Sequence, residues 1–195
     1  VSFEDFPAPE GQLPAIRRFK FISPNYFGTM GNPILAGRDF NWTDLYNKAP
    51  IAIISEPLAR EYWKDAAQAV GKRIRSMPKN PWREIVGVVG REHDDGVHRK
   101  ATTMVYWPML MANFWEEKLY AQRTMAYAIR SRRAGNPSFF GEIQKAVWSA
   151  SSNLPLANVS MLTEIYESSM ARTSFTLLML GIAAGVALLL GVVGI

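Results

Sequence analysis

The sequence predicts an α+β fold: two small mixed subdomains built of βαβ-like units, followed by a stalk helix that is continuous with a transmembrane helix. Between residues 17 and 162, short strand-like segments alternate with short helical segments that open on capping residues. The last residues, 175–195, read FTLLMLGIAAGVALLLGVVGI and carry no charged side chain. At about 1.5 Å per residue, such a helix crosses a hydrocarbon layer of about 30 Å. The alternative is a buried core helix of a soluble protein, but such a helix usually keeps a polar face.

The composition limits the class of protein. Of the 195 residues, 48% are hydrophobic, which excludes disorder for most of the chain, and the lack of cysteine excludes disulfides and thiolate chemistry. The net charge is +5, but the basic runs at 17–20 and 129–133 are isolated, and no nucleic-acid-binding signature accompanies them. The start has no signal peptide and the final apolar run has no basic flank, so we expect a part of a larger membrane protein.

The first elements are predicted as follows. Residues 1–16 are rich in proline and acidic residues and are expected to form an extended lead-in. Residues 17–22 alternate basic and apolar side chains, which is typical of a strand. Ser23-Pro24 predicts the start of a helix over residues 25–30, which Gly31 ends in the left-handed conformation. That helix is expected to bury Tyr26, Phe27 and Met30.

The middle of the chain is expected to begin with an extended run to Phe40 and a polar loop over residues 41–50. Residues 51–54 form an apolar strand, and Ser55 is predicted to cap a helix over residues 56–64, with Pro57 tolerated in its first turn. Further strands are predicted over residues 71–76, 82–89 and 102–107.

The last third is predicted to begin with an aromatic loop over residues 113–122 and a strand over residues 124–130. Asn136-Pro137 then opens a helix that runs to about Ser151, and a strand follows over residues 156–161. Thr163 is expected to cap the final helix, which has no breaker before the apolar run. A rigid rod of this kind passes any movement of the folded residues to the membrane.

No motif predicts a catalytic residue, a metal site or a cofactor. The run from His93 to His98 holds two histidines and two aspartates, but its spacing matches no metal motif, and a solvated loop is favoured. Glu56 and Glu61, like Glu116-Glu117, are two carboxylates near each other in the sequence, and nothing beyond their number indicates a catalytic pair. The glycines at 87 and 90 lack the third glycine of a dinucleotide-binding turn, and no phosphate-binding loop occurs, so the chain is not expected to hydrolyse ATP.

Small residues share one face of the apolar run. Gly181 and Gly185 form a GxxxG pair, and Leu188 and Gly191 continue that face at helical spacing. Such a face lets a second helix approach closely in a membrane. The alternative is that glycine is simply common in membrane helices. The sequence leaves both interpretations open.

Five blocks of sequence, in order, resemble the extracytoplasmic domain of MacB/FtsX-type ABC transporter permeases. They are FISPNYFGTMGNPILAGRDF; APIAIISEPLAREYW with AVGKRIR; WREIVGVVG with DDGV; TMVYWPM; and the run from Leu154-Pro155 through Glu164 into the apolar segment. The resemblance covers residues 19–195 and is closest to long permeases without a fused ATPase domain. This chain departs from the family pattern at His93.

The resemblance implies an extracytoplasmic domain over residues 1–162, with an upper subdomain at about 41–110 and an earlier part upstream of Val1. A stalk helix over residues 163–174 and a transmembrane helix over 175–195 follow, so that residues 1–170 lie outside the inner membrane. The residues expected to transmit movement along the stalk are Glu164, Ser168, Ser169 and Arg172.

The resemblance also implies a function, mechanotransmission: a cytoplasmic ATP-binding subunit moves the extracytoplasmic domain, which exports or releases a substrate. The other implied partners are a second permease copy or half, a periplasmic adaptor or outer-membrane channel, and membrane lipid. The rival hypothesis is a membrane-tethered binding or sensor domain without transport activity. Its ligand would lie in a groove lined by Trp42, Trp82, Trp107 and Trp115. An anchored hydrolase is disfavoured because no candidate nucleophile occurs.

Overall fold

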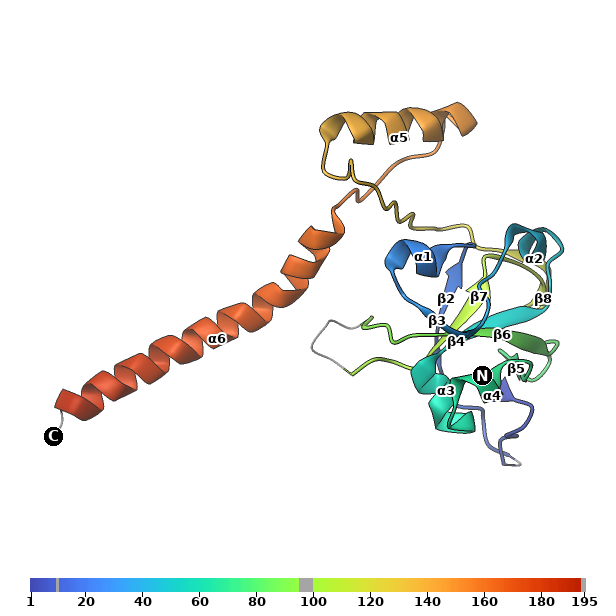
Figure 1. The fold of residues 1–195 in the computed structure, drawn as a ribbon, viewed down its shortest axis with the longest axis horizontal. Coiled ribbons are helices and arrows are strands. Elements are labelled where there is room, and N and C mark those ends of the chain that lie inside the picture. The colour runs from blue at the N-terminus through green and yellow to red at the C-terminus, as the bar shows by residue number, and fades with distance from the viewer. Residues whose placement is uncertain (10, 95–99, 194–195) are drawn as a thin grey trace. The chain divides into compact units, whose positions relative to one another are not determined.

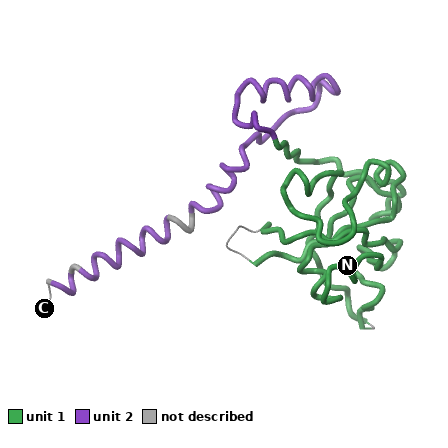
Figure 2. The backbone as a smooth tube through the Cα atoms, viewed as in Figure 1, with its two compact units in different colours: residues 1–130 green, residues 131–195 purple. Residues whose placement is uncertain are grey.

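A computed structural model describes residues 1–9, 11–94 and 100–193 of the chain (Figure 1). The chain divides into two compact units, residues 1–130 and residues 131–195 (Figure 2). Unit 1 is a mixed β-sheet with helices, and unit 2 is helical. The predicted α+β class is therefore confirmed.

Seven strands of unit 1 form one sheet, in which strands follow the order β1-β5-β6-β4-β7-β2 and β3 also pairs with β6. The sheet is mixed because β4 runs parallel to β6 and β2 parallel to β7, whereas the other pairs are antiparallel. The strands are β1 (Ser2–Phe3), β2 (Arg18–Ile22), β3 (Ile34–Gly37), β4 (Ile51–Ser55), β5 (Arg73–Arg75), β6 (Arg83–Val89) and β7 (Met104–Pro108).

Both faces of this sheet are covered. In β4, Ala52 and Ile54 belong to one hydrophobic cluster and Ile53 to the other, as expected for alternating side chains in a strand that is buried on both faces. The first cluster includes side chains of α3 (Glu56–Trp63), α4 (Ala66–Ala69) and β8 (Leu110–Phe114). The second includes Phe27 of α1 (Tyr26–Met30).

The structure corrects three predictions near the N-terminus. The first residues are not only a lead-in, because β1 pairs with β5 and buries Phe3. Helix α1 begins after Asn25 in the left-handed conformation (φ 66°), and Ser23-Pro24 precedes it without capping it. Of the three side chains expected inside, only Phe27 is fully buried, and Met30 is exposed. Gly31 ends the helix with φ 78°, as predicted.

Residues 32–50 contain two elements that were not predicted. One is β3, and the other is α2 (Trp42–Tyr46). Helix α2 opens with a capping box, because the side chain of Asn41 accepts a hydrogen bond from the Asp44 amide and that of Asp44 accepts one from the Asn41 amide.

Ser55 lies at the N-cap position of α3, but its side chain caps nothing. Its hydroxyl instead accepts a hydrogen bond of 2.9 Å from the buried amide of Met104. The predicted side-chain cap is therefore wrong, and the hydroxyl joins β4 to β7.

Four further predictions are wrong. The expected aromatic loop is a hairpin of β8 and β9 (Glu117–Ala121), and the described residues 124–130 and 156–161 contain no strand. The helix after Asn136 is confirmed: it is α5 (Pro137–Ala150), and the Asn136 side chain accepts a hydrogen bond from the Ser138 amide. The final helix, α6 (Leu162–Val193), begins one residue before Thr163, so Thr163 is not its cap.

Candidate functional site

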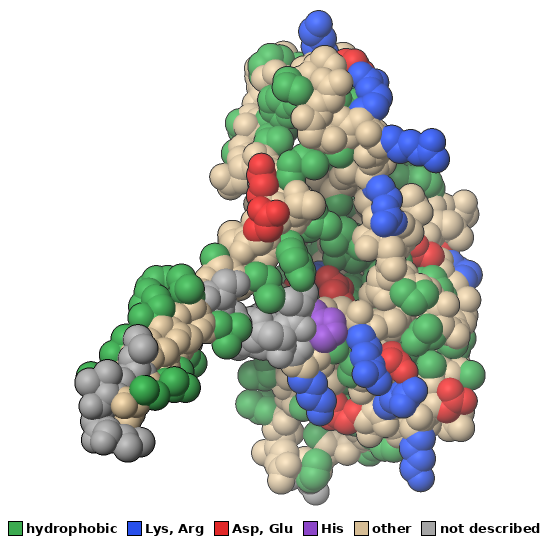
Figure 3. Space-filling view, turned by 60° about the vertical axis from the view of Figure 1, so that its left-hand side comes forward, with side chains coloured by type: hydrophobic (Ala, Val, Ile, Leu, Met, Phe, Trp, Pro, Cys, Tyr) green, Lys and Arg blue, Asp and Glu red, His purple; other side chains and the backbone are tan. Residues whose placement is uncertain are grey.

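The main candidate site is α6, a single helix of 32 residues that extends about 48 Å at 1.5 Å per residue. Its charged residues, Glu164, Glu167 and Arg172, all lie in its first third. Beyond them the described side chains are apolar or small and exposed, and hydrophobic side chains gather along the helix in Figure 3. In the described part of the chain, it is the one helix long and apolar enough to cross a membrane. The predicted continuity of stalk and apolar run is confirmed.

Glu164 fixes the start of α6. Its carboxylate accepts a hydrogen bond of 3.0 Å from the amide of Met161, and the Met161 carbonyl accepts hydrogen bonds from the amides of Glu164 and Ile165. A carboxylate at this position satisfies a free amide and interacts favourably with the helix dipole. Glu164 therefore holds the first turn of α6 in place, and its role in a stalk stays a prediction.

Two of the other predicted stalk residues, Ser168 and Ser169, are exposed on α6. The hydroxyl of Ser169 donates to the carbonyl of Tyr166 (2.9 Å) within the helix. The backbone of Arg172 is helical, but its side chain lies outside the described part. The coupling role of these residues stays a prediction.

The small-residue face of α6 contacts no other part of the described chain. Apart from the adjoining residues and the backbone of the helix itself, no described atom lies within 4 Å of the position that a Cβ would take at Gly181, Gly185 or Gly191, and Leu188 is 69% exposed. Contact with a second helix stays a prediction for this face.

Two glycines allow β3 to approach β6 closely in unit 1. A Cβ at Gly87 would lie 2.3 Å from the carbonyl oxygen of Arg38, and a Cβ at Gly37 would lie 2.2 Å from that of Val86. Gly37 also has a φ of +71°. The Arg38 amide donates a hydrogen bond of 2.9 Å to Val86 in the same place. Gly37 of LAGRDF and Gly87 of VGVVG are thus explained by packing of the sheet.

A polar cluster centred on Glu92 lies at the carboxyl end of β6. Its carboxylate pairs with the ammonium of Lys20 and accepts hydrogen bonds from the hydroxyls of Tyr26 (3.1 Å) and Tyr106 (2.5 Å). Burial raises the pKa of Tyr106, and the hydrogen bond to Glu92 raises it further. Burial alone would lower the pKa of Lys20, but its bonds to Asp94 and Glu92 raise it above its usual value. The sequence did not predict this cluster.

A surface cavity of about 290 Å³ borders the polar cluster. His93 lines it, whereas Asp95 and His98 lie outside the described residues. The described residues contain no group of three or more His, Cys, Asp or Glu that could hold a metal ion. The residues that line this cavity are Tyr26, Met30, Gly31, Asn32, Pro33, Gly90, Arg91, Glu92 and His93.

The tip of the β8–β9 hairpin is strained. Trp115 and Glu116 form its two-residue turn with φ of 49° and 68°, a conformation that usually needs Asn-Gly and costs about 1–3 kcal/mol for each other residue. The buried Arg83 supports the turn, since its guanidinium donates to the carbonyls of Ala112 (2.8 Å) and Asn113 (3.3 Å). Burial lowers the pKa of Arg83 to about 10.

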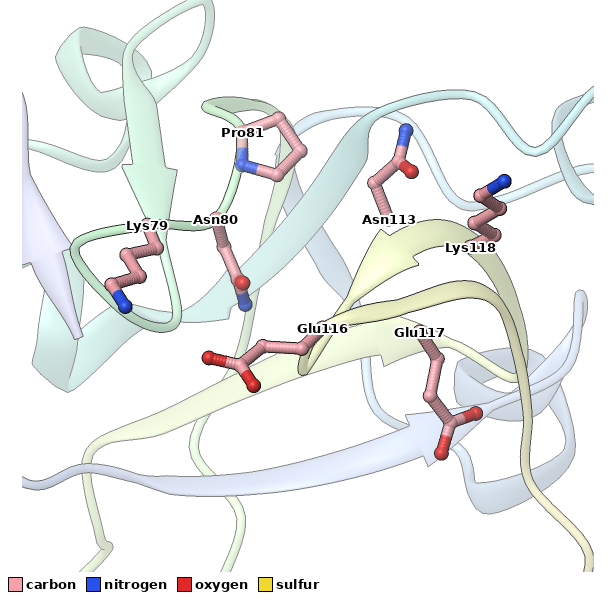
Figure 4. Close-up of a pocket in the computed structure, with 7 residues that line it drawn as sticks. All are labelled: Lys79, Asn80, Pro81, Asn113, Glu116, Glu117 and Lys118. Carbon is pink, nitrogen blue, oxygen red and sulfur yellow. The ribbon is translucent and has the colours of Figure 1, made fainter.

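A second cavity, of about 130 Å³, lies between this turn and residues 79–81. Figure 4 shows that the ammonium groups of Lys79 and Lys118 point away from each other on opposite sides. The polar groups do not converge on one point, so they suggest no ligand. The residues that line this cavity are Lys79, Asn80, Pro81, Asn113, Glu116, Glu117 and Lys118.

Of the paired carboxylates noted in the sequence, Glu56 and Glu61 are engaged in ion pairs. Glu56 pairs with Arg60 (2.7 Å) and Arg91 (3.1 Å), and Glu61 pairs with Arg17. These contacts join helix α3 to its surroundings. They do not form the pair of facing carboxyl groups that acid–base catalysis uses.

The four tryptophans of the rival hypothesis do not line one groove. Trp107 is buried in the core, the ring of Trp82 lies 4.3 Å from the guanidinium of Arg75, and neither cavity described above includes any of the four. Trp42 and Trp115 are partly exposed.

The family follows from a comparison of the sequence with models of known families. The model of the MacB-like periplasmic core domain matches residues 9–138, about two thirds of the chain. The chain belongs to this family. MacB-like periplasmic core domains are parts of ABC transporter permeases, so the resemblance seen in the sequence is confirmed at this level.

Two solved structures are similar to this MacB-like chain. The periplasmic region of MacB from Actinobacillus actinomycetemcomitans aligns with a TM-score of 0.44 and 15% identity, over 68% of this chain and 56% of that one. A domain of a putative permease protein from Porphyromonas gingivalis aligns with a TM-score of 0.46 and 15% identity, over 80% and 74%. The chain thus spans little more than half the length of the MacB region. No curated protein matches the sequence.

Proposed function

We propose that this chain is part of a permease subunit of an ABC transporter that acts by mechanotransmission. In this proposal, a cytoplasmic subunit hydrolyses ATP, and the resulting movement reaches an extracytoplasmic domain that exports or releases a substrate. The observation that carries the proposal is α6, which continues without a break from its polar first turns into an apolar segment. A helix without proline resists bending and therefore transmits displacement along its axis.

The proposed layout follows from the family and from the polarity of α6. Residues 1–162 form the extracytoplasmic domain, with an upper subdomain at about 41–110, and residues 163–174 form the stalk. Residues 175–195 enter the inner membrane. Residues 1–170 therefore lie on the periplasmic side, where the lack of cysteine is compatible with oxidising conditions.

Each predicted residue has a role in this layout. Glu164 anchors the first turn of the stalk, Ser168 and Ser169 lie at its middle, and Arg172 lies close to the lipid headgroups. The small-residue face contacts a helix of a second permease copy or half. Further partners in the proposal are a periplasmic adaptor or outer-membrane channel and membrane lipid. It includes no nucleic acid, no cofactor and no catalytic residue in this chain.

A break in the stalk tests the proposal. The double variant Ser168→Pro/Ser169→Pro removes two backbone donors from α6 and costs about 3 kcal/mol or more per proline in helix stability. The full permease is reconstituted in vesicles with its ATP-binding subunit. Spin labels are placed at Gln68→Cys, an exposed site of α4 in a chain without native cysteine. The label–label distance between two copies is measured with and without ATP.

We expect ATP to change the distance in the parent protein and not in the proline variant, while ATP hydrolysis and assembly persist. The matched control is Ser168→Ala/Ser169→Ala, which removes the same hydroxyls and keeps the helix, and which should behave as the parent does. An ATP-dependent change that survives the proline pair refutes the coupling role. A parent protein that does not respond to ATP at all favours the tethered sensor.

A further inference from the structure

We draw no further inference here: the strongest candidate, the apolar surface patch that Phe139, Phe140, Ile143 and Val147 form along α5, has no fully buried side chain, and nothing in the structure shows what covers it.

Discussion

Replacing Gly87 by alanine tests whether the close approach of β3 and β6 holds unit 1 together. Gly87 has an ordinary φ, so the substitution adds a methyl group without straining the local backbone. The new Cβ would meet the carbonyl oxygen of Arg38 at 2.3 Å, whereas real Cβ atoms essentially never come closer than 3.0 Å to such a neighbour. The obstructing atoms are backbone atoms, so the clash is relieved only if β3 moves away.

Moving β3 weakens its pairing with β6, which runs from Ile34 opposite Val89 to Gly37 opposite Gly87, and stretches the hydrogen bond from Arg38 to Val86. Overpacking in a well-packed region costs about 1–3 kcal/mol, and each lost hydrogen bond adds about 1 kcal/mol. We therefore expect Gly87→Ala to lower the free energy of unfolding of unit 1 by about 3 kcal/mol.

Substitutions at two other glycines distinguish the effect of the steric clash on stability from the effect of backbone strain. Gly71 has a φ of +83° with no atom within 4 Å of the Cβ position, so Gly71→Ala adds strain alone, about 1–2 kcal/mol. Gly37 combines a φ of +71° with a contact of 2.2 Å, so Gly37→Ala should be the most damaging of the three.

The assay is urea unfolding of the full chain in detergent, followed by tryptophan fluorescence, to which Trp63 and Trp107 contribute from the buried core of unit 1. With a slope of about 1.5 kcal/mol per molar urea, a loss of about 3 kcal/mol lowers the midpoint by about 2 M. If Gly87→Ala costs no more than Gly71→Ala, the sheet adjusts freely and the packing explanation of these glycines fails.

Two further substitutions test individual contacts. Ser55→Ala leaves the buried Met104 amide without its partner and should lower the free energy of unfolding by about 1–3 kcal/mol. Hydrogen exchange should become faster at the Met104 amide and not at the Leu58 amide. Loss of a helix cap would have the reverse effect on these two amides. Asp44→Asn tests the pH dependence of unit 1. Hydrogen bonding to Arg38 lowers the pKa of Asp44, so the ionised carboxylate stabilises the fold above its unfolded pKa. This contribution is lost as the pH falls through the folded pKa, below about pH 4. The drop in melting temperature between pH 7 and pH 3 should therefore be smaller in Asp44→Asn than in the parent, and an equal drop contradicts the assignment.

Sequence reasoning succeeded where the deciding contact lies within a few residues. Gly31 ends α1 and Asn136 caps α5 because each acts on its own turn of helix. The continuous apolar runs gave the central strands β4 and β6, which are buried on both faces. The cap of α2 was equally local, since Asn41 and Asp44 have the spacing of a capping box, but the polar residues around them suggested a loop.

Contacts between distant residues could not be read in this way. The β8–β9 hairpin turns through Trp115-Glu116, where turn statistics favour Asn-Gly, and it is supported by Arg83, which lies about thirty residues earlier in the sequence. The Glu92 cluster likewise draws Lys20 and Tyr106 from two other strands. Nothing near these residues in the sequence indicates their partners.

The two expected strands that flank α5 show most clearly what periodicity can predict. Large apolar side chains alternate with alanine in residues 125–129, and polar residues alternate with apolar ones in residues 158–161. Within the described chain, however, neither segment pairs with another strand, and Tyr127 and Val159 are 82% and 63% exposed. Alternation reports that a segment suits a half-buried, pleated surface; a strand also needs a neighbour whose N–H and C=O groups meet its own. Helix α5 behaves in the same way, because its apolar stripe matches a buried face and yet none of its residues is buried. The pattern therefore predicted which side chains are suited to burial, and only the pairing of distant segments decides whether those side chains are covered.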